Sequence, residues 1–349
     1  MSNFYKISLA ALAAAGMAVF GASNSFAEVS ISGGVDVGFG QAAEAPAVGD
    51  GSSELNTQSQ AQIDVSGGAG AVSAKYRLRV REDSRSKAKG DGIDLDGDGT
   101  ADFNDNTISD LAAVRHHVHW QINEQMGLTF MGRSFGIPGT YPGHLGVGFF
   151  DNGYGIGDGT AVGPSGGWEN TSGIDFGFNL GNMAVGAAIV TAGPGMWENQ
   201  TVIPHFTGNF GSISVGFVMG SGSGKSVDMT TFTETSVTSS EMQVGGVFST
   251  DGLKAGLGIS SVTKGDESTQ SGMELGVHVA GVEFKYFNIT TANKAGDDTG
   301  GATDIALGYR MDLGNGASLV PAYASITENP PAGTGDSATW MGVQVGTSF

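Results

Sequence analysis

The 349-residue chain contains no cysteine, so disulfide frameworks, metal–thiolate sites and cysteine nucleophiles are excluded. It is also poor in positive charge: 16 Lys and Arg stand against 35 Asp and Glu, which gives a formal net charge of −19. Such a balance is the opposite of what a nucleic-acid-binding protein needs. Nucleic acid is therefore not expected among the partners.

Long apolar runs are missing after Glu28, so any membrane crossing in that part must use strands rather than helices. One apolar run, residues 7–20, follows Lys6 and leads to the small-residue stretch Ser25-Phe26-Ala27. A basic start, a short apolar region and small residues before the cut are typical of a secretory signal peptide. We predict a signal peptide over residues 1–27 and a mature chain over 28–349.

Glycine, by contrast, is abundant, with 60 residues. Average usage is about 7%, and each interior glycine costs a helix about 1 kcal/mol relative to alanine. The composition therefore disfavours a helical protein and favours strands.

Alternation of apolar and polar residues is the main structural signal, because successive side chains of a strand point to opposite faces. A clear case has apolar Val72, Ala74, Tyr76, Leu78 and Val80 between polar Ser73, Lys75, Arg77, Arg79 and Arg81. Similar segments start at Val29, Leu55 and Val114, and further strands are predicted near Leu128, Ile174, Met183, Thr201, Ile213, Glu241, Leu253, Met273, Val282, Thr303, Ser318 and Ala338. The total is about sixteen strands, of which two are interrupted by Pro204 and Pro321, since proline removes a ladder donor.

Short and long connections are predicted to alternate along the chain. The short ones are residues 67–70, 124–127, 181–182, 211–212, 250–252, 280–281 and 314–316. The long ones are residues 41–53, 82–109, 136–171, 192–200, 220–238, 264–271, 291–301 and 328–336. Short periplasmic turns on one rim and long extracellular loops on the other are typical of an outer-membrane β-barrel. A soluble β-sandwich or β-helix would alternate in hydropathy too, but would not need this succession of links.

The end of the chain carries a further signal, because Met341, Val343, Val345, Thr347 and Phe349 alternate with small or polar residues. With the opening stretch Glu28-Val29-Ser30-Ile31-Ser32-Gly33 and Gly132-Arg133-Ser134, the chain resembles the trimeric sixteen-stranded Gram-negative porins of the general-diffusion type. The resemblance implies an all-β transmembrane antiparallel barrel in the bacterial outer membrane. It further implies a homotrimer in contact with lipid and lipopolysaccharide, and passive diffusion of small hydrophilic solutes and ions.

A barrel of this size is expected to enclose water. In hydrocarbon an unsatisfied backbone group costs several kcal/mol, so a membrane sheet must close on itself. Eight strands leave an interior filled by side chains, whereas sixteen leave an aqueous channel. The polar faces of the predicted strands carry Gln, Asn, Ser, Asp, Lys and Arg, which lumen water can solvate.

Basic residues are concentrated in one region, since six of the seven arginines lie between Arg77 and Arg133. In the resembling family the third long loop, here residues 136–171, folds into the lumen with acids facing a basic wall. The resemblance therefore implies a constriction formed by Lys75, Arg77, Arg79, Arg81, Arg115, Arg133, Asp151 and Asp158. Charged walls at a constriction discriminate ions. His117 and His119 lie beside this patch, as polar lumen residues or as metal ligands.

A calcium-loop pattern lies in the acidic second long link, residues 82–109. Residues 94–105 follow D-x-D-x-D-G, with a glycine at the sharp turn and hard oxygen donors at the spacing that Ca²⁺ requires. The predicted ligands are Asp94, Asp96, Asp98, Thr100, Asp102 and Asp105. The twelfth position is Asp105 rather than the usual Glu. We predict bound Ca²⁺ here, no organic cofactor, and a role for the loaded loop in steadying the trimer or its packing against lipopolysaccharide.

Three other functions compete with general diffusion. A substrate-specific channel would take anions such as phosphate, or sugars. An outer-membrane lipase or protease would need a nucleophile and histidine in arranged geometry, but none of the six histidines lies in a recognisable nucleophile motif. We therefore predict no enzymatic activity. A structural or adhesive barrel would have negligible conductance.

Overall fold

The computed structural model describes residues 28–44, 53–83, 110–133, 135–140, 142–145, 172–191, 200–228, 233–263, 267–328 and 337–349. Among these residues no helix is long and apolar enough to cross a membrane.

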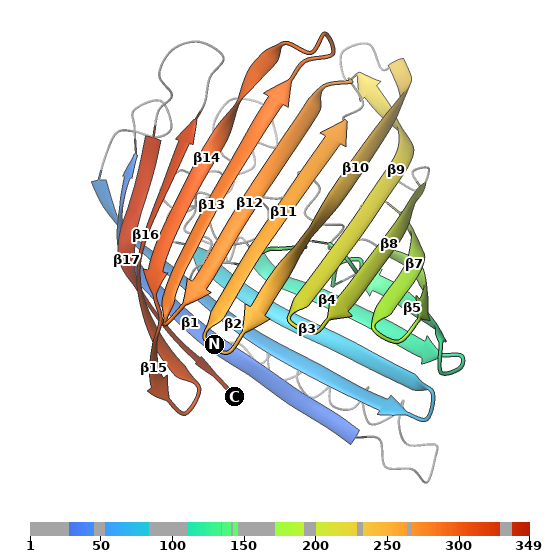
Figure 1. The fold of residues 1–349 in the computed structure, drawn as a ribbon, viewed down its shortest axis with the longest axis horizontal. Coiled ribbons are helices and arrows are strands. Elements are labelled where there is room, and N and C mark those ends of the chain that lie inside the picture. The colour runs from blue at the N-terminus through green and yellow to red at the C-terminus, as the bar shows by residue number, and fades with distance from the viewer. Residues whose placement is uncertain are drawn as a thin grey trace.

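Within these ranges seventeen strands form a single antiparallel sheet (Figure 1). They are β1 (Glu28–Glu44), β2 (Ser53–Ala69), β3 (Val72–Asp83), β4 (Asp110–Gln121), β5 (Met126–Arg133), β6 (Ser172–Asn179), β7 (Met183–Thr191), β8 (Gln200–Phe210), β9 (Ile213–Asp228), β10 (Thr233–Thr250), β11 (Leu253–Thr263), β12 (Thr269–Val279), β13 (Val282–Ala292), β14 (Asp298–Tyr309), β15 (Met311–Gly314), β16 (Ala317–Glu328) and β17 (Ser337–Ser348). The strands pair with their neighbours in chain order, except that β14 and β15 both pair with β16.

The sheet closes into a barrel of sixteen staves. Closure comes from β1, which pairs with β17 from Gly34↔Ser348 to Glu44↔Ala338. The short strand β15 continues β14, because both pair with β16. The predicted fold class, an antiparallel barrel of about sixteen strands, is confirmed.

A proline explains the break between β14 and β15. Pairing of β14 with β16 ends at Gly308↔Ala322, and pairing of β15 resumes at Met311↔Leu319. The gap lies opposite Pro321, which has no N–H to donate to the ladder. Pro204 has the same effect in β8, where pairing with β9 passes from Val202↔Ser221 directly to His205↔Val218. Both prolines lie in strands, as predicted, and each interrupts one ladder.

Short turns lie on one rim of the barrel, as the sequence indicates. The link between β12 and β13 is the pair Ala280 and Gly281, with φ of 50° and 84°. Positive φ at both central residues is the hairpin turn whose twist matches that of antiparallel strands. Glu28 pairs with Gly68, beside the short turn that joins β2 to β3. Strand β17 ends on the same rim, where Ser348 donates its N–H to Gly316 O.

The two faces of the sheet differ as a membrane barrel requires. In β12, Met273 and Leu275 are 42% and 39% exposed, whereas Glu274 between them is fully buried. Outward positions of other strands carry the same kind of residue, for example Phe39, Trp120, Phe130 and Val345. The apolar face therefore surrounds the barrel and the polar face lines its interior.

The strands are longer than the alternation predicts. Residues 220–238 are predicted as a long link, but β9 runs to Asp228 and β10 starts at Thr233, with Gly220↔Glu241 and Asp228↔Thr233 in register. About 9–11 residues suffice to cross a bilayer, and these strands have 16 and 18. Outside the membrane neither face of a strand has to be apolar. The backbone pairing therefore continues there although the hydropathy of the residues does not alternate. The predicted links at 41–53 and 291–301 are too long for the same reason.

Candidate pore constriction

The segment that follows β5 lies inside the barrel. Its described residues, 135–140 and 142–145, contact the inner wall from β3 to β12. These residues belong to the start of the predicted third long loop, and whether the loop as a whole enters the lumen stays a prediction. We call residues 135–145 the inward segment; residues 146–171 lie outside the described residues.

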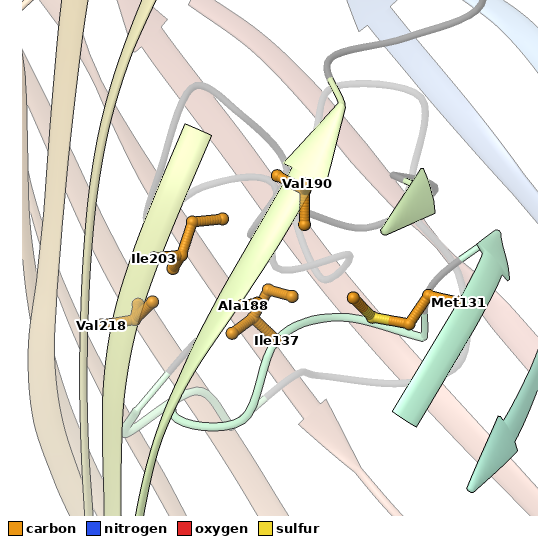
Figure 2. Packing of buried hydrophobic residues seen from close by; sticks show 6 residues of the cluster. All are labelled: Met131, Ile137, Ala188, Val190, Ile203 and Val218. Atoms are coloured by element: carbon orange, nitrogen blue, oxygen red, sulfur yellow. The ribbon is translucent and has the colours of Figure 1, made fainter. Parts of the chain in front are cut away.

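An apolar anchor fixes the start of the inward segment. Ile137 is 2% exposed and packs with buried side chains of β5, β7, β8 and β9 (Figure 2). These partners are Met131, Ala188, Val190, Ile203 and Val218. Burial of one such side chain contributes about 1.5–3 kcal/mol. The anchor is unusual for a polar lumen and explains why these inward positions are apolar.

A row of wall glycines lets the inward segment lie flat. Gly216, Gly245, Gly256 and Gly276 belong to four successive strands, β9 to β12, and we call them the glycine track. A Cβ at Gly276 would lie 2.5 Å from Leu145 Cβ, and one at Gly256 would overlap the carbonyl oxygen of Gly143. Any larger residue on the track would therefore displace the segment from the wall.

An ionic contact holds the far end of the inward segment. His144 Nδ1 lies 2.6 Å from Oε1 of the fully buried Glu274 on β12. Lys285 Nζ on β13 lies 3.4 Å from the same oxygen, and this lysine is also buried. A buried carboxylate is tolerated only with such partners. The anchor, the track and this contact together fix the path of the segment.

The predicted basic wall forms on β3 and β4. Arg77 lies directly opposite Arg115 in register, and Lys75 lies opposite His117. On its other side Arg77 faces Asp64 of β2. Its Nε and Nη2 donate hydrogen bonds to Asp64 Oδ1 and Oδ2 at 2.7 and 2.8 Å. A bidentate pair of this kind fixes the guanidinium in one orientation.

Phe135 joins the basic wall to the inward segment. Lys75 Nζ lies 4.8 Å from the centre of its ring, and Arg77 Cζ lies 5.2 Å from it. His117 contacts the ring edge-to-face at a centroid distance of 5.0 Å. Both cations are within the range of a cation–π interaction. The first residue of the segment described after β5 thus packs on the wall cations.

The remaining predicted site residues are placed as follows. Arg79 and Arg81 continue β3, with Arg79 opposite Ala113 and Arg81 opposite Asp110. Arg133 ends β5 opposite His116. Asp151, Asp158 and the calcium-loop residues 94–105 lie outside the described residues. The structure therefore brings together Lys75, Arg77 and Arg115 and leaves the two loop acids untested.

Buried acids lie on other strands of the lumen, and most of them are on the opposite wall. In a closed barrel of sixteen staves, β3 and β4 face β11 and β12. Asp175, Glu241, Glu274, Glu283 and Asp304 point inward from β6, β10, β12, β13 and β14 and are all buried. Three have basic partners: Asp175 contacts His205 at 2.7 Å, Glu274 contacts His144 and Lys285, and Glu283 contacts Arg310 at 2.6 Å.

Sequence reasoning missed the partner roles of Asp64, Phe135 and the glycine track. The signal for Asp64 is the hairpin register: the turn is Gly70-Ala71 rather than residues 67–70, and this shift places Asp64 opposite Arg77. The signal for the track is a glycine at inward positions of consecutive strands. Phe135 has no signal in the sequence that separates it from the other phenylalanines.

Comparisons with known proteins establish the fold. No protein-family model and no curated protein matches the chain. Among solved structures, it is similar to an outer-membrane-expressed OmpT of Vibrio cholerae, with a TM-score of 0.58, 12% identity and coverage of 94% of this chain and 99% of that one. For an anion-selective porin from Comamonas acidovorans the TM-score is 0.58 and the identity 16%, and the match covers 93% of this chain and 100% of that one. For the outer membrane channel DcaP of Acinetobacter baumannii the TM-score is 0.59 and the identity 11%, and the match covers 94% of this chain and 99% of that one. The chain therefore has the fold of outer-membrane β-barrels.

Proposed function

We propose that this chain is an outer-membrane porin, which forms a water-filled channel for passive diffusion of small hydrophilic solutes and ions. The observation that carries the proposal is a closed barrel of sixteen staves, apolar outside and polar inside. Sixteen strands are enough for an aqueous lumen. Two of the similar structures are a porin and an outer membrane channel by their descriptions, which supports the same role.

The inward segment gives the channel its constriction. It lies against β8 to β12, and its Phe135 contacts Lys75 and Arg77 of the basic wall. A channel narrowed by a fixed segment excludes solutes by size and by charge. General diffusion then requires that permeation rates fall smoothly with solute size.

A planar-bilayer recording tests the proposed function. Purified protein should insert in steps of fixed conductance, and groups of three equal steps would support the proposed homotrimer. Swelling of protein-loaded liposomes in sugars of increasing size separates general diffusion from a specific channel, because a specific site saturates and a diffusion pore does not. A folded barrel that inserts without conductance would exclude a channel.

We also propose that residues 94–105 bind Ca²⁺. The support is the spacing of the oxygen ligands in the sequence, which matches the requirement of the ion. The long acidic link that holds them connects β3 to β4, the two strands of the basic wall. Bound Ca²⁺ would neutralise the link and steady it against a neighbouring subunit or lipopolysaccharide.

A further inference from the structure

We propose that the channel prefers anions, with Lys75 as the principal cation along the water path and Phe135 as the residue that positions it. This inference rests on the proposed channel function. It is opposite to the preference that the net charge of −19 would suggest. The reason lies in which charges of the lumen meet water.

The buried acids named above are withdrawn from water, whereas Asp64 on the basic wall is partly exposed. Glu274 is fully buried, and Asp304 and Glu283 are 3% and 4% exposed. Asp175 pairs with His205, Glu283 with Arg310, and Glu274 with both His144 and Lys285. A paired and buried carboxylate exerts little net field on a passing ion. This wall therefore attracts cations only weakly.

The basic wall, in contrast, is partly exposed. Lys75, Arg77, His117 and His119 are all of intermediate exposure. Arg77 is balanced by the bidentate pair with Asp64. Among the ion pairs of the described residues none involves Lys75, whose ammonium contacts the ring of Phe135 instead. No described carboxylate contacts the Lys75 ammonium directly, and Asp64 acts on it only at a distance.

Phe135 decides where that charge lies. A lysine side chain is long and flexible, and without a partner its ammonium would occupy many positions. The contact with the Phe135 ring holds Nζ at the point where the inward segment leaves β5. A fixed charge at the narrow level of the channel acts on each passing ion, whereas a mobile one is spread along the wall.

Reversal potentials in a KCl gradient test this inference with wild type, Lys75→Gln and Phe135→Leu. The matched control is Lys294→Gln, because Lys294 is exposed in the link between β13 and β14 and pairs with the exposed Glu267. Wild type should favour chloride over potassium. Lys75→Gln should lower the permeability ratio about two- to fivefold, as expected for one charge a few ångströms from an ion in water. Phe135→Leu should lower it less, and Lys294→Gln should leave it unchanged.

The outcomes separate the two proposals. An absence of conductance from folded wild-type barrels would overturn the channel function and this inference with it. Normal conductance with a potassium preference would overturn the inference alone. Equal ratios in wild type and a conducting Lys75→Gln would remove Lys75 as the determinant. An unchanged ratio in Phe135→Leu, which retains every charge, would remove the positioning role of the ring.

Discussion

Individual side chains in this barrel are defined by their cross-strand partners. Arg77 is held between Asp64 of β2, Arg115 of β4 and the ring of Phe135. Like charges placed opposite each other in a sheet are destabilising. The carboxylate of Asp64 therefore offsets the repulsion between Arg77 and Arg115, which lie opposite each other on β3 and β4.

Removal of the Asp64 charge should strengthen the basic wall. In Asp64→Asn the Arg77 guanidinium loses its carboxylate, so its charge adds to that of Lys75 and the chloride preference should rise about two- to fivefold. Thermal stability should fall slightly, because a hydrogen bond to a charged group contributes about 1.5–3 kcal/mol. Reversal potentials and a melting curve measure both effects.

Asp251→Asn is the control for that change, because Asp251 lies in the exposed turn between β10 and β11. It removes the same charge from the rim rather than the lumen and should leave the preference unaltered. A chloride preference that falls in Asp64→Asn would contradict the view that Asp64 compensates Arg77.

Register explains why such partners escape sequence reasoning. Alternation assigned Lys75, Arg77 and Arg115 to the lumen correctly, because it depends only on parity. Opposite neighbours depend on the position of the turn, and the predicted turn at residues 67–70 would place Asp64 opposite Ser73 instead of Arg77. A small error in the predicted position of a turn thus leaves each residue on the correct face of the sheet but assigns it the wrong cross-strand neighbour.

At the scale of elements, the position of the inward segment depends on the absence of side chains along part of the barrel wall. The glycine track provides a surface without side chains on four neighbouring strands, and the anchor at Ile137 supplies the apolar contact. Gly143 has a φ of 96°, which allows the segment to bend along the wall. The strands thus form the binding surface for their own loop.

A methyl group on the track should loosen the inward segment. In Gly256→Ala the new Cβ would overlap the Gly143 carbonyl, and overpacking of this kind costs about 1–3 kcal/mol. The segment can lift more easily than the strand can move, so single-channel conductance and its noise should increase. Gly177→Ala is the matched control, because a Cβ there has no atom within 4 Å. Equal conductance in the two variants would show that the track does not hold the segment.

Strand lengths mark the limit of alternation as a signal. The sequence predicted the sixteen staves, because the part of each strand that crosses the membrane alternates in hydropathy. It did not predict the extension of β9 and β10, in which residues such as Ser223 and Thr235 continue the backbone pairing. Alternating hydropathy marks only the part of a strand that crosses the membrane, whereas backbone pairing sets the full length of the strand.

The acidic link between β3 and β4 yields a prediction about metal removal. If residues 94–105 bind Ca²⁺, a chelator should lower the melting temperature of the assembled protein, since a ligand that binds only the folded form stabilises it by mass action. Asp98→Asn should remove that response, whereas Asp251→Asn should retain it. Melting followed by gel mobility or circular dichroism provides the measurement. A curve unchanged by chelator would remove the structural role of calcium.

For the whole molecule, net charge and channel selectivity are separate properties. Acids outnumber bases by 35 to 16, yet five acids of the described lumen are buried and Lys75 is partly exposed. The opposed placement of the two walls, eight staves apart, follows from closure of the barrel. A preference that arises in this way is produced by the field of fixed charges rather than by direct coordination of the ion.

Such a field should weaken as salt is added. The Debye length is about 10 Å at 0.1 M and about 3 Å at 1 M, so added salt screens Lys75 from ions in the middle of the channel. The ratio of chloride to potassium permeability should therefore be largest in dilute KCl and approach unity near 1 M. Reversal potentials at a fixed gradient ratio and rising mean concentration measure this change. A ratio that stays constant up to 1 M would instead require dehydrated ions in contact with the wall, a narrower passage than the inward segment and the basic wall are proposed to form.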